Sequence, residues 1–126
     1  MKNAISWFEI PVIDIARAQK FYEILMDWKL ELMEMGVAKM AIFPGAADSE
    51  NQNLIHGALI QSPETTPSDK GAMIYFNAGQ DLSSYLSRVD QAGGAVIQPK
   101  TSIGAHGFYA TFKDTEGNIH ALHSPN

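Results

Sequence analysis

The run Phe108-Tyr-Ala-Thr-Phe-Lys-Asp-Thr-Glu-Gly-Asn-Ile-His-Ala-Leu-His123 is the most informative stretch of this chain. Two β-forming segments, Phe108 to Lys113 and Asn118 to His123, flank a short polar turn that ends in Gly117-Asn118. Glycine and asparagine tolerate the positive φ that a tight hairpin requires, so this stretch predicts a β-hairpin. The face of its second strand decides which side chains a functional site can use.

Length, composition and charge exclude several classes of protein. The chain has 126 residues, enough for one domain over residues 1–126 and too few for two ordinary ones. Hydrophobic residues make up 45% and charged residues 18%, as in soluble globular proteins. The net charge of −5, without a lysine or arginine cluster, disfavours nucleic acid as a partner. The absence of cysteine excludes disulfides, thiolate metal sites and a cysteine nucleophile.

No segment predicts a membrane or secretory destination. The N-terminal run Met1 to Glu9 lacks the apolar core of a signal peptide. No apolar run approaches the ~20 residues that a membrane helix needs. We therefore expect a cytoplasmic protein without a membrane partner.

The first half of the chain predicts a strand, a helix and three further strands. Ile5 to Val12 is expected to form the first strand, and Asp14 can cap the helix that follows. Four apolar residues of that helix show the i, i+3, i+4, i+7 spacing of one helix face: Ala18, Phe21, Tyr22 and Leu25. The three strand-like runs after it are Lys29 to Glu34, Val37 to Phe43 and Leu54 to Gln61.

The second half repeats this plan after a linker rich in turn formers, Ser62 to Lys70. Ala72 to Asn77 predicts a strand, Asp81 can cap a helix, and Gly93-Gly94 ends that helix. The apolar face of the helix has the same spacing, with Leu82, Tyr85, Leu86 and Val89. The remaining predicted strands are Ala95 to Gln98, Phe108 to Lys113 and Asn118 to His123.

The inferred order is βαβββ twice, which is an α+β fold with a structural repeat. One module covers about residues 1–61, and the other covers about residues 71–126. Each module is expected to form a curved mixed sheet with its helix on the convex side. The concave faces of the two sheets are then expected to meet around a cavity.

Three motifs resemble those of the vicinal oxygen chelate superfamily, which includes glyoxalase I, extradiol dioxygenases, and fosfomycin- and bleomycin-resistance proteins. Pro11 to Leu25, with its valine-x-aspartate turn and Phe-Tyr pair, resembles the superfamily's opening, although Met26-Asp27-Trp28 replaces the usual glycine before the aromatic residue. Asp114-Thr-Glu-Gly-Asn118 resembles its Asp-Pro-Asp-Gly-Asn hairpin, and Gln91 to Val96 resembles its exit from the second helix. The resemblance implies the fold over almost the whole chain but no single reaction, because fold does not specify function.

Metal-dependent members of this superfamily place His, Glu or Gln ligands at four strand positions that face the cavity. Counting from the motifs puts these positions at Trp7, near Ala58, near Ala72 and at Ala121. Indole is only a hydrogen-bond donor and alanine has no donor atom for a metal, so these side chains bind no divalent cation. The resemblance therefore implies a branch without the usual metal ligands, and we predict no cofactor.

An error in the strand register would change that conclusion. A slip of one residue would put His120 at the fourth position and turn the strand over. A slip of two residues keeps the face and brings in Glu9, His56 and His123, a two-histidine, one-carboxylate set of the kind that iron and zinc accept. A divalent metal belongs only to this alternative.

Glu9 is the best single polar candidate, since it lies mid-strand and faces the expected cavity. It is either a general base or hydrogen-bond acceptor for a ligand, or a carboxylate satisfied by its neighbours. His56 and His123 lie near strand ends and are interpreted as residues of the cavity rim, whereas His120 is expected to face the helix layer or the surface. His106 lies on a loop flanked by glycines, at the expected mouth of the cavity.

Five apolar residues are candidates for the cavity lining, and Trp7 among them could stack on a planar ligand. The sequence does not settle which face Tyr109 takes. The five candidates are Trp7, Phe43, Ile74, Phe76 and Tyr109. Asp14, Phe21, Tyr22, Asp114 and Gly117 are interpreted as residues that serve the fold.

Three functions agree with these observations. The first is a metal-free binder of a small, partly apolar or aromatic molecule, similar to bleomycin-resistance members of the superfamily. The second is a lyase, isomerase or dioxygenase that uses a displaced metal or Glu9 as its base. The third is a self-associating module, and the resemblance implies a homodimer.

Overall fold

The computed structural model describes residues 3–44 and 55–126, which form two four-stranded mixed sheets. In sheet order, the first sheet contains β1 (Trp7–Pro11), β4 (His56–Gln61), β3 (Ala38–Ile42) and β2 (Glu31–Met35). The second contains β5 (Tyr75–Asn77), β8 (Ile119–Ser124), β7 (Phe108–Lys113) and β6 (Ala95–Ser102). In each sheet the first pair is parallel and the others are antiparallel. The predicted α+β fold of two βαβββ modules is confirmed.

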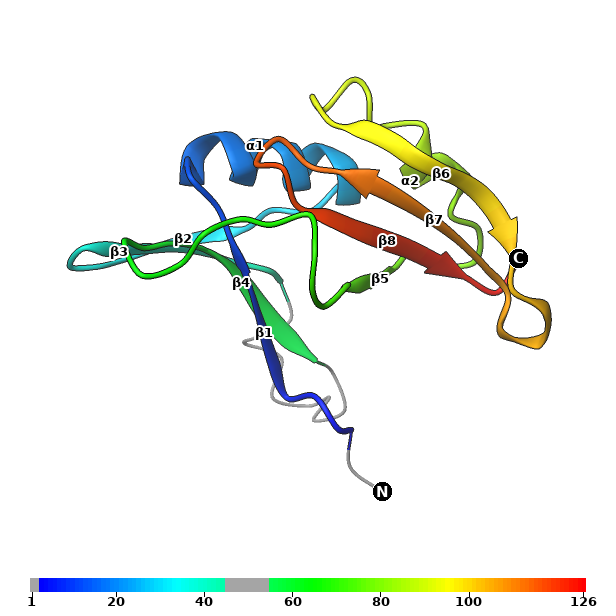
Figure 1. Ribbon diagram of the computed structural model, residues 1–126, viewed down its shortest axis with the longest axis horizontal. Coiled ribbons are helices and arrows are strands. Elements are labelled where there is room, and N and C mark those ends of the chain that lie inside the picture. Colours follow the sequence, from blue (N-terminus) through cyan, green and yellow to red (C-terminus); the bar gives the residue numbers. More distant parts are fainter. Residues whose placement is uncertain (1–2, 45–54) are drawn as a thin grey trace.

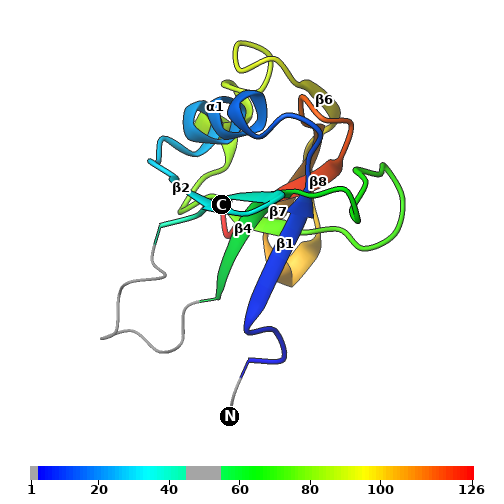
Figure 2. The same cartoon turned by 90° about the vertical axis from the view of Figure 1, so that its left-hand side faces the viewer.

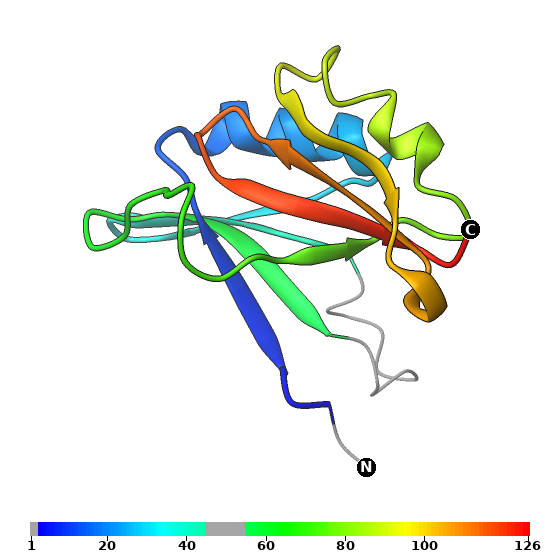
Figure 3. The ribbon, with the colours of Figure 1, turned by 45° about the vertical axis from the view of Figure 1, so that its right-hand side comes forward.

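The helix α1 (Ile15–Met26) packs over both sheets with the apolar face that the sequence predicts. It begins at Asp14, whose Oδ1 accepts the backbone N–H of Arg17 at 3.1 Å, as expected for an N-cap. It ends at Asp27, which has the left-handed conformation with φ 55°. Figures 1 and 3 show α1 and α2 on the same side of the molecule, so within the described residues neither α-helix covers the opposite side of the sheets.

The helix α2 (Ser83–Leu86) is shorter than the predicted helix, and turns continue from it to Gly93. Serine favours local hydrogen bonds over a helix interior, and Ser87 Oγ donates to Ser84 O at 2.6 Å. Asp81 still accepts the N–H of Ser83 at 2.9 Å, although Leu82 takes the cap position. Two of the predicted apolar residues, Leu82 and Val89, are fully buried.

An aromatic cluster fills the core between α1 and the sheets. The ring of Tyr22 lies at its centre, with centroids 5.7 Å from Phe43, 5.6 Å from Phe76 and 6.3 Å from Phe112. Phe43 and Phe76 are only 4% and 5% exposed. The prediction that Phe43 and Phe76 line a cavity is therefore wrong, because both side chains lie on the face that packs into the core. Phe43 shares the face of the buried Ala41, two residues before it, and Phe76 pairs with the buried Leu122.

Each sheet has a second face, turned away from α1, which we call the open face. Side chains alternate between the two faces of a strand, so burial assigns each position. On β1, Ile10 belongs to the core and Phe8 packs against it, which leaves Trp7, Glu9 and Pro11 on the open face. Figures 2 and 3 show that β1 and β4 diverge from β5 and β8, so within the chain the two sheets do not close on each other.

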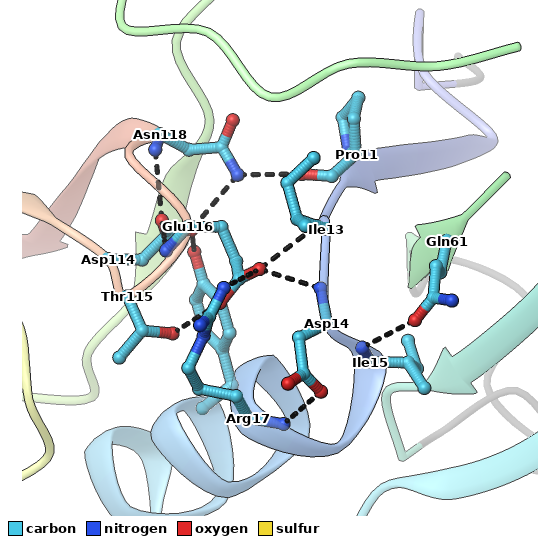
Figure 4. Close-up of polar contacts among 11 residues, drawn as sticks. Pro11, Ile13, Asp14, Ile15, Arg17, Gln61, Asp114, Thr115, Glu116 and Asn118 are labelled. Carbon is cyan, nitrogen blue, oxygen red and sulfur yellow. Dashed lines mark hydrogen bonds and ion pairs between the residues drawn. The ribbon is translucent and has the colours of Figure 1, made fainter. Parts of the chain in front are cut away.

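A polar junction connects the start of α1 to the hairpin between β7 and β8 (Figure 4). Oε1 of Glu116 accepts the backbone N–H groups of Ile13 and Asp14, each at 2.9 Å. Oε2 of the same carboxylate forms an ion pair with Nε of Arg17 at 2.7 Å. The buried hydroxyl of Tyr22 donates to Oδ2 of Asp114 at 2.7 Å. Residues of both modules therefore share one hydrogen-bonded network.

The predicted hairpin turn is present, and Gly117 has the positive φ of 92° that its position requires. Asn118 donates from Nδ2 to the carbonyl of Pro11 at 2.8 Å and accepts from the N–H of Ser68 at 3.0 Å. The linker, residues 62–70, contains no helix or strand. Asn118 therefore holds the hairpin, β1 and the linker together.

Several predicted strands differ in length from the observed ones, and β1, β2 and β3 are all shorter than predicted. β6 continues to Ser102 through register shifts after Val96 and Gln98, and β5 begins at Tyr75 rather than at Ala72. Leu54, where a strand was expected to begin, lies outside the described residues. Among the described residues, no helix has the length and apolarity to cross a bilayer. The cytoplasmic location stays a prediction.

Candidate functional site

The open face of the first sheet is mostly apolar. Cross-strand partners lie side by side on one face. One such row joins Pro11, Ile60, Met40 and Met33, and the next joins Glu9, Ala58, Ile42 and Glu31. Trp7 pairs with His56 at one end of this face, and Met35 pairs with Ala38 at the opposite end. Trp7, Met33 and Met35 are 41%, 42% and 55% exposed, so they are not core residues.

Glu9 and Trp7 form a pair on this face. The indole Nε1 of Trp7 donates to Oε2 of Glu9 at 3.1 Å. This contact orients the indole and uses one acceptor site of the carboxylate, which has further lone pairs for a ligand. Ala58, the cross-strand neighbour of Glu9, is fully buried and contributes only a methyl group. The pair therefore places one ionisable group next to an aromatic ring on an apolar surface.

The open face of the second sheet is more polar. The register places Tyr75, Ala121 and Thr111 in one row. Asn77, His123 and Tyr109 form the next row, so the face of Tyr109, which the sequence left open, is now assigned. Tyr75 is 53% exposed. Hydroxyl, amide and imidazole groups on this face can donate and accept hydrogen bonds.

The histidines take four different positions. His123 lies on the open face, and its Nε2 contacts the carbonyl oxygen of His106 at 2.6 Å, which ties the exposed 3-10 turn η1 (Gly104–His106) to β8. His56 is half-buried beside Trp7. His120 faces the helix layer, as predicted, and is 7% exposed. Its Nδ1 accepts the N–H of Ile74 at 3.1 Å.

The superfamily's metal positions do not fit a divalent cation. Trp7, Ala58 and Ala121 lie on the open faces, as the motif count predicts, and none of them has a metal-binding atom. Ala72 precedes β5, and the alternation of Tyr75 and Asn77 extends back to Met73 instead. The count is therefore one residue out at this position. A thioether is a ligand for soft metals, so Met73 does not restore the site.

The displaced site of Glu9, His56 and His123 is not assembled within one chain. Among residues 3–44 and 55–126, no three His, Asp or Glu side chains come together as a possible metal group. Glu9 and His56 belong to the first sheet, whereas His123 belongs to the second and contacts His106.

The structure brings together some predicted site residues and not others. Trp7, Glu9 and His56 share one open face, and Tyr109 and His123 share the other. Ile74 is half-buried against the core, so it does not lie on the open face with them. Sequence reasoning missed the three methionines of the first sheet, Met33, Met35 and Met40. Their i, i+2 spacing in β2 and their cross-strand partners were the available signal.

Comparison with known proteins agrees with this architecture. Residues 4–121 match the family model described as the Glyoxalase/Bleomycin resistance protein/Dioxygenase superfamily. A glyoxylase-like domain-containing protein from Didymella fabae is 32% identical over 126 residues, which cover 97% of this chain and 94% of that protein.

Solved structures show the same fold at lower identity. A hypothetical protein, SA1046 from S. aureus, has a TM-score of 0.68 at 22% identity, covering 98% of this chain and 95% of that one. TnmS3, an antibiotic binding protein from Streptomyces sp. CB03234, has a TM-score of 0.64 at 24% identity, covering 98% and 97%. Glyoxalase I from Zea mays has a TM-score of 0.71 at 21% identity, and the match covers 95% of this chain but 45% of the maize chain. The chain therefore belongs to the glyoxalase/bleomycin resistance protein/dioxygenase superfamily.

Proposed function

We propose that this protein binds a small, partly apolar or aromatic molecule on its open faces, without the help of a metal. The observation that carries the proposal is the pair of Trp7 and Glu9 on an apolar sheet face. Trp7 occupies the strand position at which the motif count places a metal-ligating residue of the superfamily. A ligand on this face would stack on the indole and bury apolar surface against exposed side chains such as Met33. Each 100 Å² buried in this way stabilises the complex by roughly 2.5 kcal/mol before the cost of association.

Polar groups of the second sheet support a ligand that is not wholly apolar. Thr111, Tyr109 and His123 offer hydrogen bonds at defined positions of its open face. Binding sites for small molecules commonly combine an apolar lining with a few polar groups that fix orientation. An aromatic ring with a polar substituent could pack on the apolar face of the first sheet and form hydrogen bonds with the polar groups of the second.

The proposal is tested with 8-anilinonaphthalene-1-sulfonate as an aromatic probe. We expect saturable binding, followed by probe fluorescence, to protein dialysed against EDTA. Trp7→Ala should weaken binding by at least about tenfold, because it removes the stacking surface and the donor to Glu9. Trp28→Phe is the matched control, since Trp28 packs against Phe43 on the other side of the sheet.

Two results would contradict the proposal. One is equal affinity in the Trp7→Ala variant and in the wild type. The other is loss of binding on EDTA dialysis with recovery on addition of zinc or iron. A metal-free turnover of a bound compound, lost in Glu9→Gln, would instead favour an enzyme with Glu9 as general base.

We also propose that the protein forms a homodimer whose second copy helps to enclose the open faces. Large apolar side chains on them, Trp7, Met35 and Tyr75 among them, are 41–55% exposed in the single chain. The maize glyoxalase I chain, of which this fold covers 45%, has room for two such units. Sedimentation velocity at micromolar concentration tests this proposal, and a monomer at every concentration would contradict it.

A further inference from the structure

A pocket of about 210 Å³ lies between β1, the linker and the first residues of β8. It adjoins the open face of the first sheet, because Glu9 and Pro11 border both. Six of its lining residues carry the argument: Glu9, Ser68, Lys70, Ala72, Ile74 and His120. The pocket therefore combines apolar walls with a carboxylate, a hydroxyl, an ammonium group and an imidazole.

His120 has a ring nitrogen without a partner. Its Nδ1 accepts the N–H of Ile74 at 3.1 Å, so in the neutral ring the proton belongs to Nε2. Nε2 is buried and has no hydrogen-bond partner. Burial lowers the pKa of His120, against the opposing charge of Asp114, so the ring is neutral at neutral pH. A buried N–H without an acceptor is destabilising, and an incoming acceptor would remove that penalty.

Glu9 has the complementary need, since its carboxylate can accept a hydrogen bond from a ligand. Its carboxylate accepts one bond from Trp7 and has lone pairs left for a further donor. The ammonium group of Lys70 contributes little attraction, because its side chain is 86% exposed and pairs with Asp69 at 3.7 Å. The lining thus offers the neutral donor of His120 and the acceptor of Glu9 beside the Ser68 hydroxyl, and Lys70 adds little positive charge.

We propose that this pocket binds a small neutral amide, whose carbonyl oxygen accepts the Nε2–H of His120 and whose N–H groups donate to Glu9. A primary amide supplies an acceptor and a donor on two atoms bonded to the same carbon. A carboxylate ligand meets repulsion from Glu9, and an ammonium ligand offers no acceptor to His120. Because Nε2 is covered, binding requires a small displacement of the residues around His120.

The experiment is an NMR titration of the full chain with acetamide, observing the ring nitrogens of His120. We expect a saturable shift of Nε2 with a dissociation constant on the order of 10 mM, as suits a ligand of four heavy atoms. Sodium acetate at the same ionic strength should leave Nε2 unchanged. A shift of Nε2 with acetate and none with acetamide would overturn the assignment. The absence of a saturable shift with either compound would overturn it too, and this result is expected if only water enters the pocket.

Two variants test the residues. His120→Asn places an amide oxygen near Nδ1, which keeps the acceptor for Ile74 and removes the Nε2 donor. Its acetamide affinity, followed at the Ile74 amide, should fall by at least about tenfold. Ala72→Leu fills the pocket without changing either hydrogen-bonding group and should abolish binding while leaving Trp7-dependent probe binding intact. Unchanged acetamide affinity in both variants would overturn the proposal.

Discussion

Glu116 joins the two modules through four hydrogen bonds that its carboxylate accepts from the first module, two from backbone N–H groups and two from Arg17. Its side chain has no exposed surface. Burial alone would raise the pKa of Glu116, but the bonds from Arg17, Asp14, Thr115 and Ile13 outweigh it and hold the pKa at about 2. The negative charge of Glu116 near the N-terminus of α1 also interacts favourably with the positive end of the helix dipole.

Replacing Glu116 with glutamine should lower the free energy of unfolding at pH 7 by about 1–3 kcal/mol, since it weakens charge-assisted hydrogen bonds. The carboxyl is ionised in the folded state down to about pH 2, so its stabilisation is complete above pH 4.5 and is lost as the pH falls toward 2. The difference between the variant and the wild type should therefore shrink over that range. Urea unfolding at pH 7, 5 and 3 measures this, with the exposed Glu31→Gln as control. A difference that does not depend on pH would contradict it.

Tyr22 contributes the buried hydroxyl of the same junction. Burial first, and the charge of Asp114 second, raise the pKa of Tyr22 well above its usual value, so the hydroxyl stays a donor. Tyr22→Phe should lower the unfolding free energy by about 1–3 kcal/mol, because Asp114 loses a bond in a buried site. Thermal unfolding of Tyr22→Phe and of the exposed control Tyr75→Phe makes the comparison. Equal effects in both variants would argue against this role.

Among the secondary-structure elements, β1 and β4 depend on one close approach. An added Cβ at Gly57 would clash with the ring of Phe8, at Cε1. That ring contacts Phe43 and Phe76, with centroids at 5.7 and 6.2 Å, so a displacement of Phe8 is transmitted into the core. Glycine therefore allows the ring to lie against the neighbouring strand.

Gly57→Ala should consequently destabilise the protein by about 1–3 kcal/mol, the usual cost of overpacking a core. A double-mutant cycle with Phe8→Leu checks the cause, since the smaller side chain leaves room for the methyl group. The expected result is that Gly57→Ala costs much less in the Phe8→Leu background. Strict additivity in urea unfolding would show that Phe8 is not the obstacle.

Strand β8 should make stability depend on pH through His120. The folded-state pKa of this histidine lies below its usual value of 6.5, so the unfolded chain binds the proton more tightly. Stability from the neutral ring is therefore complete above pH 6.5 and falls as the pH drops below it. His120→Asn should flatten the curve of unfolding free energy between pH 7 and pH 5. The same slope in both proteins would contradict this assignment.

The strand faces show how far the sequence predicts the site. In β1, Glu9 is the polar residue between the core residues Phe8 and Ile10, and Trp7 lies on the same face as Glu9. In β3, Met40, Ala41 and Ile42 are all apolar, so the alternation gave no signal, and the face of Phe43 was predicted wrongly. Similarly, the apolar spacing after Asp81 predicts a longer helix, but Ser83 and Ser84 in α2 and Ser87 directly after it favour turns.

At the scale of the whole molecule, the junction and the aromatic core join the two modules on one side only. The helices and the rings of Tyr22 and Phe76 lie there, and the sheets diverge on the other side (Figure 3). Length could predict one domain with a single core, but not the angle between the sheets. That angle depends on contacts between distant residues, such as Arg17 with Glu116.

A pair of substitutions on one strand tests whether the open face is the functional surface. Met33 lies on the open face of β2 and Leu32 on the opposite face, and they are similarly exposed, at 42% and 49%. A glutamate at either position should change the unfolding free energy by less than about 1 kcal/mol, since both sites are near solvent. Met33→Glu should weaken probe binding and shift sedimentation toward the monomer, because it places a charge on the apolar surface. Leu32→Glu should leave both measurements unchanged. Equal effects from the two variants would mean that general hydrophobicity of β2, rather than its open face, drives binding.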